Sequence, residues 1–224
     1  MSLPPVITVD GPSGSGKGTL AGLLAERLGW HLLDSGALYR IVGAQAIARG
    51  LALDDEAAIA GMAAGLDIRF EDDRVLVDGE DLTRTIRTEA VSSAASQVAA
   101  LEGVRQAIFG LQRAMRRAPG LVADGRDMGT VVFPEADLKV YLEASPEVRA
   151  ERRYNQLKNK GLSVTFRALL ASIRERDERD MRRAVSPLRP AQDAILVDST
   201  ELTIDQVLDR VLAEARTRGL AKGI

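Results

Sequence analysis

The sequence predicts an α/β fold in which about five parallel strands are covered by helices. Short runs rich in β-branched residues alternate with longer helical stretches, a pattern typical of parallel sheets with helices on both faces. The candidate strands are Val6-Ile7-Thr8-Val9, His31-Leu32-Leu33, Leu121-Val122-Ala123, Lys139-Val140-Tyr141-Leu142 and Ile195-Leu196-Val197. The composition agrees with a globular chain of this kind, because 46% of the 224 residues are hydrophobic and 28% are charged.

The composition excludes several classes of protein. The absence of cysteine removes disulfide scaffolds, thiolate zinc sites, iron–sulfur clusters and thiol catalysis. His31 is the one histidine, so a histidine-rich metal site is excluded, and we expect a structural role for it. A net charge of −2 disfavours a broadly basic nucleic-acid-binding protein. Because no run reaches the roughly 18 to 20 apolar residues of a membrane span and no basic signal region opens the chain, we expect a cytoplasmic protein.

The first and last helices and one excursion from the sheet are indicated by their patterns. Leucines recur at helical spacing from Leu20 to Leu28, and Gly29 is expected to end this helix. The final helix is expected from about Thr203 to Arg218. Between Leu66 and Leu82, two alternating runs flank a polar turn, which predicts a small antiparallel hairpin outside the main sheet.

A glycine-rich segment directly follows the first predicted strand. It reads Gly11-Pro12-Ser13-Gly14-Ser15-Gly16-Lys17-Gly18-Thr19 and satisfies the phosphate-binding pattern Gly-x-x-x-x-Gly-Lys. Glycines let successive backbone N–H groups converge on phosphate oxygens, and Lys17 can reach the terminal phosphates. The alternative is a plain connecting turn, which the lysine and the flanking strand and helix disfavour. Because Gly18 stands where the pattern has Ser or Thr, we assign no protein ligand to a metal ion.

The helix from about Val164 changes character along its length. Its first half carries an apolar stripe that should bury against the domain, formed by Phe166, Leu169, Leu170 and Ile173. The same face continues with Arg176, Asp177, Asp180, Arg183 and Ala184. Buried charges need partners, so we expect this face to open onto a polar cleft for an anionic ligand. The alternative is a solvated helix end with i,i+4 pairs such as Arg176 with Asp180.

Three further clusters lie at the ends of predicted elements. Arg126 and Asp127 follow a strand, at the edge where open α/β sheets bind ligands; a closing Asp-Gly turn is the alternative. There an arginine can hold phosphate and an aspartate can accept base or sugar hydrogen bonds. Ser35 follows another strand and is either a ligand-binding residue or a helix N-cap. The basic segment from Glu151 to Gly161 is either a lid over phosphates or a solvated helical hairpin.

Together these motifs resemble those of bacterial cytidylate kinases. The resemblance extends from Val6 to about Val207 and rests on Gly11 to Thr19, Leu33-Asp34-Ser35-Gly36, Ile86-Arg87-Thr88, Ala95-Ser96-Gln97-Val98-Ala99, Asp124 to Thr130, and Arg176 to Arg183. It implies a P-loop NTPase-type parallel five-stranded sheet with a small antiparallel insert and a helical lid. It also implies phosphorylation of CMP and dCMP by ATP with Mg²⁺. These nucleotides would be the partners of a monomer that binds no nucleic acid and no membrane.

The resemblance further implies a division of the chain and roles for its residues. The core is expected at 1–35, 120–150 and 184–224, the monophosphate-binding region at about 36–119 with the insert at 66–87, and the lid at about 151–165. The residues implied around cytosine are Ser96, Arg105, Asp127 and Arg183; those near the sugar are Ser35 and Asp180; those around the acceptor phosphate are Arg40, Arg126 and Arg176. Arg152 and Arg153 are implied as lid arginines near the transferring phosphoryl group, with Lys17 on the donor side.

Phosphoryl transfer to a phosphate oxygen needs positioning, charge neutralisation and exclusion of water. The acceptor phosphate is already a competent nucleophile, so the residues need not include a strong general base. Two alternatives remain open from the residues alone: a P-loop kinase for another small acceptor, such as a sugar acid, and a nucleotide-hydrolysing switch.

Overall fold

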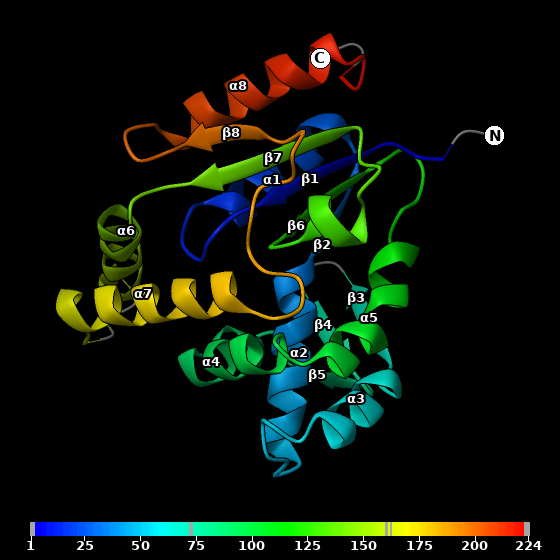
Figure 1. Ribbon diagram of the computed structural model, residues 1–224, viewed down its shortest axis with the longest axis vertical. Coiled ribbons are helices and arrows are strands. Elements are labelled where there is room, and N and C mark those ends of the chain that lie inside the picture. The colour runs from blue at the N-terminus through cyan, green and yellow to red at the C-terminus, as the bar shows by residue number, and fades with distance from the viewer. Residues whose placement is uncertain (1–2, 72–73, 160, 162, 222–224) are drawn as a thin grey trace. The chain divides into compact units, whose positions relative to one another are not determined.

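The computed structural model describes residues 3–71, 74–159, 161 and 163–221 (Figure 1). By its internal contacts the chain forms two compact units. The larger unit comprises Met1–Leu33 and Met115–Ile224, and the smaller unit is Asp34–Ala114. The expected boundaries of a core, a monophosphate-binding region and a lid are functional assignments and stay predictions.

A five-stranded sheet organises the larger unit. Its strands are β1 (Val6–Asp10), β2 (His31–Asp34), β6 (Leu121–Gly125), β7 (Leu138–Glu143) and β8 (Ile195–Asp198). They lie in the order β2-β6-β1-β7-β8, and β1 runs parallel to both β6 and β7. The prediction of a parallel five-stranded sheet flanked by helices is confirmed, and each predicted strand lies within an observed one.

Two helices and the central strands share one apolar core in the larger unit. Helix α1 (Lys17–Leu28) contributes Leu20 and Leu24, and helix α8 (Ile204–Thr217) contributes Val211 and Leu212. Every residue of β1 is buried, as expected of a central strand in a covered sheet. One end of each helix agrees with the sequence. Helix α1 ends at Gly29, which caps it in the left-handed conformation, and helix α8 begins directly after Thr203, which forms a capping box.

The remaining helices of the larger unit follow β6 and β7. A short π-helix, η2 (Met128–Val132), comes after β6, and α6 (Pro146–Asn159) comes after β7. Helix α7 (Phe166–Arg182) packs against α6, beside which it lies in Figure 1. The predicted glycine between the two helices is Gly161, with φ of 73°. The neighbouring Lys160 and Leu162 lie outside the described residues.

The prediction that the apolar stripe on α7 is buried against the domain is wrong. Phe166 is 41% exposed, and Leu169, Leu170 and Ile173 are only partly buried. The neighbouring α6 is dominated by charged and polar side chains, so it gives an apolar stripe little to pack against. The buried residues of α7 are instead two carboxylates, Asp177 and Asp180.

The smaller unit combines helices with a second sheet. Its helices are α2 (Ser35–Ala48), α3 (Glu56–Ala64), η1 (Thr85–Arg87), α4 (Glu89–Val98) and α5 (Glu102–Ala114). Helix α2 packs on α4, and α3 packs on α5. The predicted antiparallel hairpin is confirmed as β3 (Ile68–Glu71) and β4 (Arg74–Val77). A third strand of two residues, β5 (Glu80–Asp81), was not predicted; the tight turn at Asp78 and Gly79, both with positive φ, brings it back onto β4.

Candidate functional site: a phosphate loop and a buried charged cluster

The glycine-rich loop joins the carboxyl end of β1 to the first turn of α1. Gly11 has a φ of 153°, and a Cβ atom there would lie 2.0 Å from the Leu142 carbonyl oxygen, so no larger residue fits. Gly16 is the N-cap of α1, with φ of 94° and ψ of 2°, a left-handed conformation that favours glycine. The loop therefore presents the positive end of a helix at the edge of the sheet.

Lys17 is the first residue of α1 and is held inside the loop. It is 9% exposed, its Nζ donates to the Pro12 carbonyl at 3.3 Å, and it lies 4.0 Å from Oδ1 of Asp124. At Gly18, where the pattern has Ser or Thr, a Cβ atom would come within 3.2 Å of the Asp124 carboxylate, a tight contact with a side chain. Asp124 received no role of its own from the sequence, although it opens the motif Asp124 to Thr130. Its position directly after the predicted strand Leu121-Val122-Ala123 was an available signal.

Behind the loop, a buried carboxylate organises the turn that follows β6. Asp10, at the end of β1, accepts hydrogen bonds from the backbone N–H groups of Met128 at 2.8 Å and Gly129 at 2.7 Å. Burial raises the pKa of Asp10 to about 7; the two N–H groups oppose this rise, and the charges of Asp127 and Asp124 add to it. Sequence reasoning missed Asp10 as well, because its partners lie more than 100 residues away along the chain.

The charged residues predicted on α7 and after β6 are brought together in the larger unit. Arg126 Nε donates to Asp180 Oδ2 at 3.0 Å, and Arg183 Nη2 lies 3.8 Å from Asp180 Oδ1. Asp180 and Arg183 are buried, Arg176 is partly buried, and Asp127, two residues before Gly129, is 2% exposed. The predicted cluster of charges is thus a paired, buried network rather than a solvated surface.

This network sets the charge state of Asp180. Burial by itself would raise the pKa of its carboxyl, but Arg126, Arg183 and Arg176 outweigh that effect and leave the pKa below its ordinary value. The alternative of a solvated helix end holds for the other side of α7, where Arg179 pairs with Glu175 and Arg182 with Glu178 in exposed i,i+4 pairs. The two sides of the helix therefore carry charges for different reasons.

Arg152 and Arg153 lie next to each other on α6 but in different surroundings. Arg152 donates to the Ser15 carbonyl of the loop at 3.3 Å and to the Ser199 carbonyl at 2.6 Å. Arg153 donates to the side chain of Gln156 at 2.7 Å on the exposed side of the helix.

A cavity of about 340 Å³ lies beside the phosphate loop in the larger unit. Its polar lining includes Ser15, Thr19 and Arg152, and its apolar lining includes Leu202, Ile204 and Val207. This combination suits a flat, largely apolar group that carries charged phosphates at one end.

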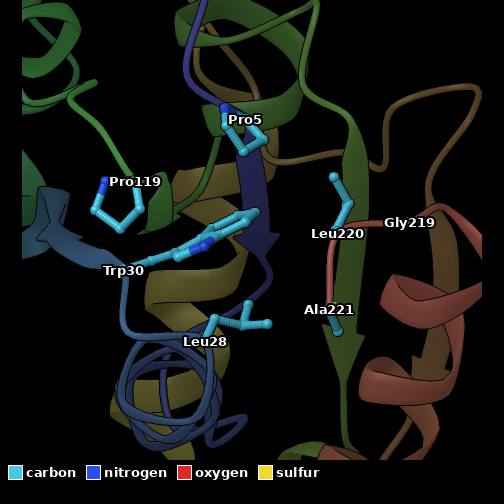
Figure 2. A pocket seen from close by; sticks show the side chains of 7 residues that line it. All are labelled: Pro5, Leu28, Trp30, Pro119, Gly219, Leu220 and Ala221. Atoms are coloured by element: carbon cyan, nitrogen blue, oxygen red, sulfur yellow. The ribbon is translucent and has the colours of Figure 1, made fainter. Parts of the chain in front are cut away.

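A second cavity of about 320 Å³ has a different character (Figure 2). Its lining contains no charged side chain, and the Trp30 ring points into it among Pro5, Leu28 and Leu220. Pro5 precedes β1 and Pro119 precedes β6, so the cavity lies at the amino ends of these strands. Ligands of open α/β sheets bind beyond the carboxyl ends, so this cavity is not the site that the sequence predicts.

In the smaller unit, Ser35 and Arg40 lie on the first turns of α2. The N-cap of α2 is Asp34, whose side chain accepts from the Ala37 N–H at 2.9 Å, so the alternative of Ser35 as the N-cap is wrong. Ser35 is buried, and its Oγ accepts from Gln112 Nε2 at 3.0 Å. Arg40 donates to the Gly36 carbonyl at 3.2 Å and lies 3.5 Å from Asp34.

Ser96 and Arg105 are buried on α4 and α5 of the same unit. The Arg105 guanidinium lies 5.5 Å from the centre of the Tyr39 ring and donates to the Ala99 carbonyl at 3.1 Å. The cation–π contact with Tyr39 and the hydrogen bond to Ala99 together restrict the position of the Arg105 guanidinium.

Two kinds of feature are absent from the part of the chain that the structure covers. Within 3–71, 74–159, 161 and 163–221, no group of three or more His, Cys, Asp or Glu side chains is arranged to hold a metal ion. Over these same residues, none of the helices has the length and apolar character needed to cross a membrane.

Comparison with known proteins identifies the family. A family model described as cytidylate kinase matches residues 7–217. The chain belongs to the cytidylate kinase family. A cytidylate kinase of Aeromonas hydrophila subsp. hydrophila is 60% identical over 94% of each chain, and one of Pseudomonas savastanoi pv. phaseolicola is 59% identical over 97% of each. A third, from Pseudomonas aeruginosa, is 57% identical over 96% of each chain. The resemblance to cytidylate kinases inferred from the motifs is therefore confirmed.

The fold of this cytidylate kinase family member also occurs in more distant proteins. A crystal structure of an uncharacterized protein from Eubacterium ventriosum superposes with a TM-score of 0.54 at 12% identity. The match covers 95% of this chain and 99% of the other. At such low identity the likeness concerns the fold alone.

Proposed function

We propose that the protein transfers the γ-phosphoryl group of ATP to CMP and dCMP, giving CDP and dCDP. The proposal is supported by membership of the cytidylate kinase family and by 57–60% identity to relatives named cytidylate kinase. The observation that carries it is the phosphate loop, with Lys17 buried at the N-terminus of α1 and directed to the inside of the loop.

The donor nucleotide is assigned to the loop and its cavity. The loop amides and Lys17 would bind the phosphates of ATP, and the cavity lined by Leu202, Ile204 and Val207 would hold its base. Mg²⁺ would be bound mainly by the phosphate oxygens of ATP, because it usually takes only one or two carboxylates from the protein in such sites. Asp124, 4.0 Å from Lys17, would be the carboxylate that binds it, and the charge of Mg²⁺ would offset that of the phosphates.

The acceptor nucleotide is assigned to residues of each unit. In the larger unit, Arg126 and Arg176 would bind the acceptor phosphate, Asp180 the sugar hydroxyls, and Asp127 and Arg183 the cytosine. In the smaller unit, Arg40 would bind the phosphate, Ser35 the sugar, and Ser96 and Arg105 the cytosine. Their buried partners support these roles: Arg126 is fixed by Asp180, and Arg105 by Tyr39.

The transfer itself then depends on positioning and charge. The acceptor phosphate oxygen attacks the γ-phosphorus as the bond to the β-phosphate bridging oxygen breaks, and ADP leaves. Lys17, Arg126 and Arg176 would offset the charge of the transferring group, with Arg152 and Arg153 acting from the proposed lid at 151–165. Closure of that lid would exclude water and so suppress hydrolysis of ATP.

We further propose that the protein acts as a cytoplasmic monomer.

ADP formation from ATP and Mg²⁺ tests the proposal directly. The acceptors are CMP, dCMP, UMP, AMP, dTMP and a sugar acid at equal concentration, with a reaction that contains no acceptor as the baseline. We expect turnover with CMP and dCMP, little with AMP, and almost none without acceptor. Equal hydrolysis with and without acceptor would instead indicate a nucleotide-hydrolysing switch, and activity restricted to a sugar acid would indicate another kinase.

A variant of the loop tests which residues carry the reaction. Lys17→Ala should lower kcat by about 100-fold or more, because the transferring charge loses its counterion. Arg210→Ala, an exposed cation on α8, is the matched control and should leave kcat unchanged. Near-normal turnover of a folded Lys17→Ala variant would remove the loop from the active site.

A further inference from the structure

Arg149 on α6 is a buried arginine that the proposed transfer of phosphoryl groups does not use. It is 3% exposed, and three of its hydrogen bonds go to backbone or side-chain oxygens at ordinary distances. Nε donates to the Ala144 carbonyl at 2.9 Å, and Nη1 donates to the Ser13 carbonyl at 3.0 Å. Nη1 also donates to Asp177 Oδ1 at 3.0 Å, and Nη2 donates to the other oxygen of the same carboxylate. The guanidinium therefore joins the phosphate loop, the start of α6 and helix α7.

The contact with Ser13 fixes the orientation of a peptide group in the phosphate loop. In a trans peptide the carbonyl and the N–H point in opposite directions. A donor that holds the Ser13 carbonyl toward α6 therefore turns the Gly14 N–H away from α6. Gly14 itself lies against this helix, because a Cβ atom built on it would stand 3.3 Å from the Cβ of Arg149. A phosphate-binding loop works only when its N–H groups, and not its carbonyls, face the phosphates.

The same guanidinium also contacts α7, through the Asp177 carboxylate. Asp177 is adjacent to Arg176 and three residues before Asp180, and both of these are assigned to the acceptor nucleotide. A two-pronged arginine–carboxylate pair fixes distance and angle together, which a single point charge does not. Arg149 is thus one side chain that contacts both the Ser13 carbonyl of the loop and the Asp177 carboxylate of α7.

A second ion pair between the same two helices provides a comparison. Arg174 of α7 donates to Glu147 of α6 at 2.6 Å, but the two side chains are 61% and 53% exposed. Exposed pairs of this kind contribute little, because water solvates both charges when the pair opens. The buried pair between Arg149 and Asp177 lacks that alternative, so it constrains the two helices whereas the exposed pair does not.

We propose that Arg149 is a positioning residue that orients the Ser13–Gly14 peptide of the phosphate loop and ties it, through Asp177, to the register of α7. It acts on the reaction through the loop and α7 and does not touch a nucleotide itself. The inference rests on the proposed function for its effect on turnover, but its effect on the loop concerns nucleotide binding alone.

Arg149→Lys tests the proposal, with Arg174→Lys as the matched control. Both changes keep the charge and replace an arginine that joins α6 to α7, but a lysine at 149 cannot serve Ser13, Ala144 and Asp177 at once. Two measurements are made below the unfolding midpoints of all variants: kcat with CMP, and the change of the Gly14 amide NMR signal when ADP is added. We expect Arg149→Lys to lower kcat by about tenfold or more and to halve the Gly14 response, and Arg174→Lys to change neither.

Several outcomes would overturn the proposal. One is a folded Arg149→Lys variant with wild-type kcat and a wild-type Gly14 response; another is a loss of thermal stability alone. If the wild type binds ADP with a Gly14 response but does not use CMP, the proposed function fails, and the Gly14 comparison alone decides this inference. If Arg149→Lys does not fold, Asp177→Asn replaces it: the Gly14 response should persist while the KM for CMP rises about fivefold or more. An unchanged KM would refute the link to α7.

Discussion

Replacement of Asp10 with asparagine offers a quantitative test of the electrostatics behind the phosphate loop. The Asp10 carboxylate is 5% exposed and accepts two backbone N–H groups, from Met128 and Gly129. Burial nevertheless raises its pKa from 3.8 to about 7. In the unfolded chain the same carboxyl returns to its ordinary value. The stability of the protein must therefore depend on pH through this one group.

The sign and size of the effect follow from the two pKa values. Because the folded value is the higher one, ionisation of Asp10 costs stability. The cost is absent below about pH 3.8, where the carboxyl is protonated in both states, and is complete above about pH 7. At about 1.4 kcal/mol for each unit of pKa, the full cost is about 4 kcal/mol, and about 2.5 kcal/mol of it develops between pH 5 and pH 8.

The assay is urea unfolding of the wild type and Asp10→Asn at pH 5 and pH 8. Asparagine carries no charge but turns its amide toward one of the two N–H donors, which lowers stability by an amount that does not depend on pH. The stability of the variant relative to the wild type should therefore rise by about 2.5 kcal/mol from pH 5 to pH 8. Asp209→Asn, an exposed carboxylate on α8, is the control and should show no such trend. Parallel pH profiles for Asp10→Asn and the wild type would refute the reasoning.

Three further predictions concern other parts of the larger unit. Gly11→Ala should destabilise the protein by about 3 kcal/mol or more in thermal unfolding, because its Cβ atom would stand 2.0 Å from the Leu142 carbonyl oxygen; wild-type stability would contradict the loop geometry. Thr203→Ala removes the capping box of α8 and should cost about 1 kcal/mol in urea unfolding, with no loss counting against that cap. Asp180→Asn should destabilise the protein near neutral pH, because Arg126 and its neighbours hold the pKa of Asp180 below 3.8. That difference from the wild type should begin to shrink as the pH falls below about 4 and should be lost once the pH is below the folded-state pKa; a difference that does not shrink over this range would exclude the charge as the cause.

The features that could be predicted from the sequence are those with a local signal. The phosphate loop is recognisable because glycines, a lysine, a preceding strand and a following helix all lie within one short segment. The five strands are recognisable because strands of a covered sheet are largely apolar. This holds for β1, which is buried along its whole length, and also for the outer strands β2 and β8, although Leu32 and Leu196 are exposed there. The end of α1 at Gly29 was predicted for the same kind of reason, since a left-handed cap favours glycine.

The features that could not be predicted depend on partners distant in the chain. Arg149 and Asp177 are 28 residues apart, and Asp10 and Met128 are 118 apart, so no window of sequence contains both partners. The stripe on α7 failed for a related reason. Helical spacing shows which residues share a face, but whether Phe166 becomes buried depends on α6, which offers mostly charged and polar side chains.

The pairing of Arg126 with Asp180 has a consequence for the energy of ligand binding. An arginine that is free in solution loses about 2 kcal/mol of rotational freedom when a ligand immobilises it. Arg126 is already immobilised by Asp180 at 3.0 Å and by the Gly125 carbonyl at 3.2 Å. The side chain therefore loses its conformational entropy when the protein folds, before any ligand binds. An incoming phosphate meets a preorganised guanidinium, so less of its interaction energy is offset by side-chain ordering and its affinity is higher.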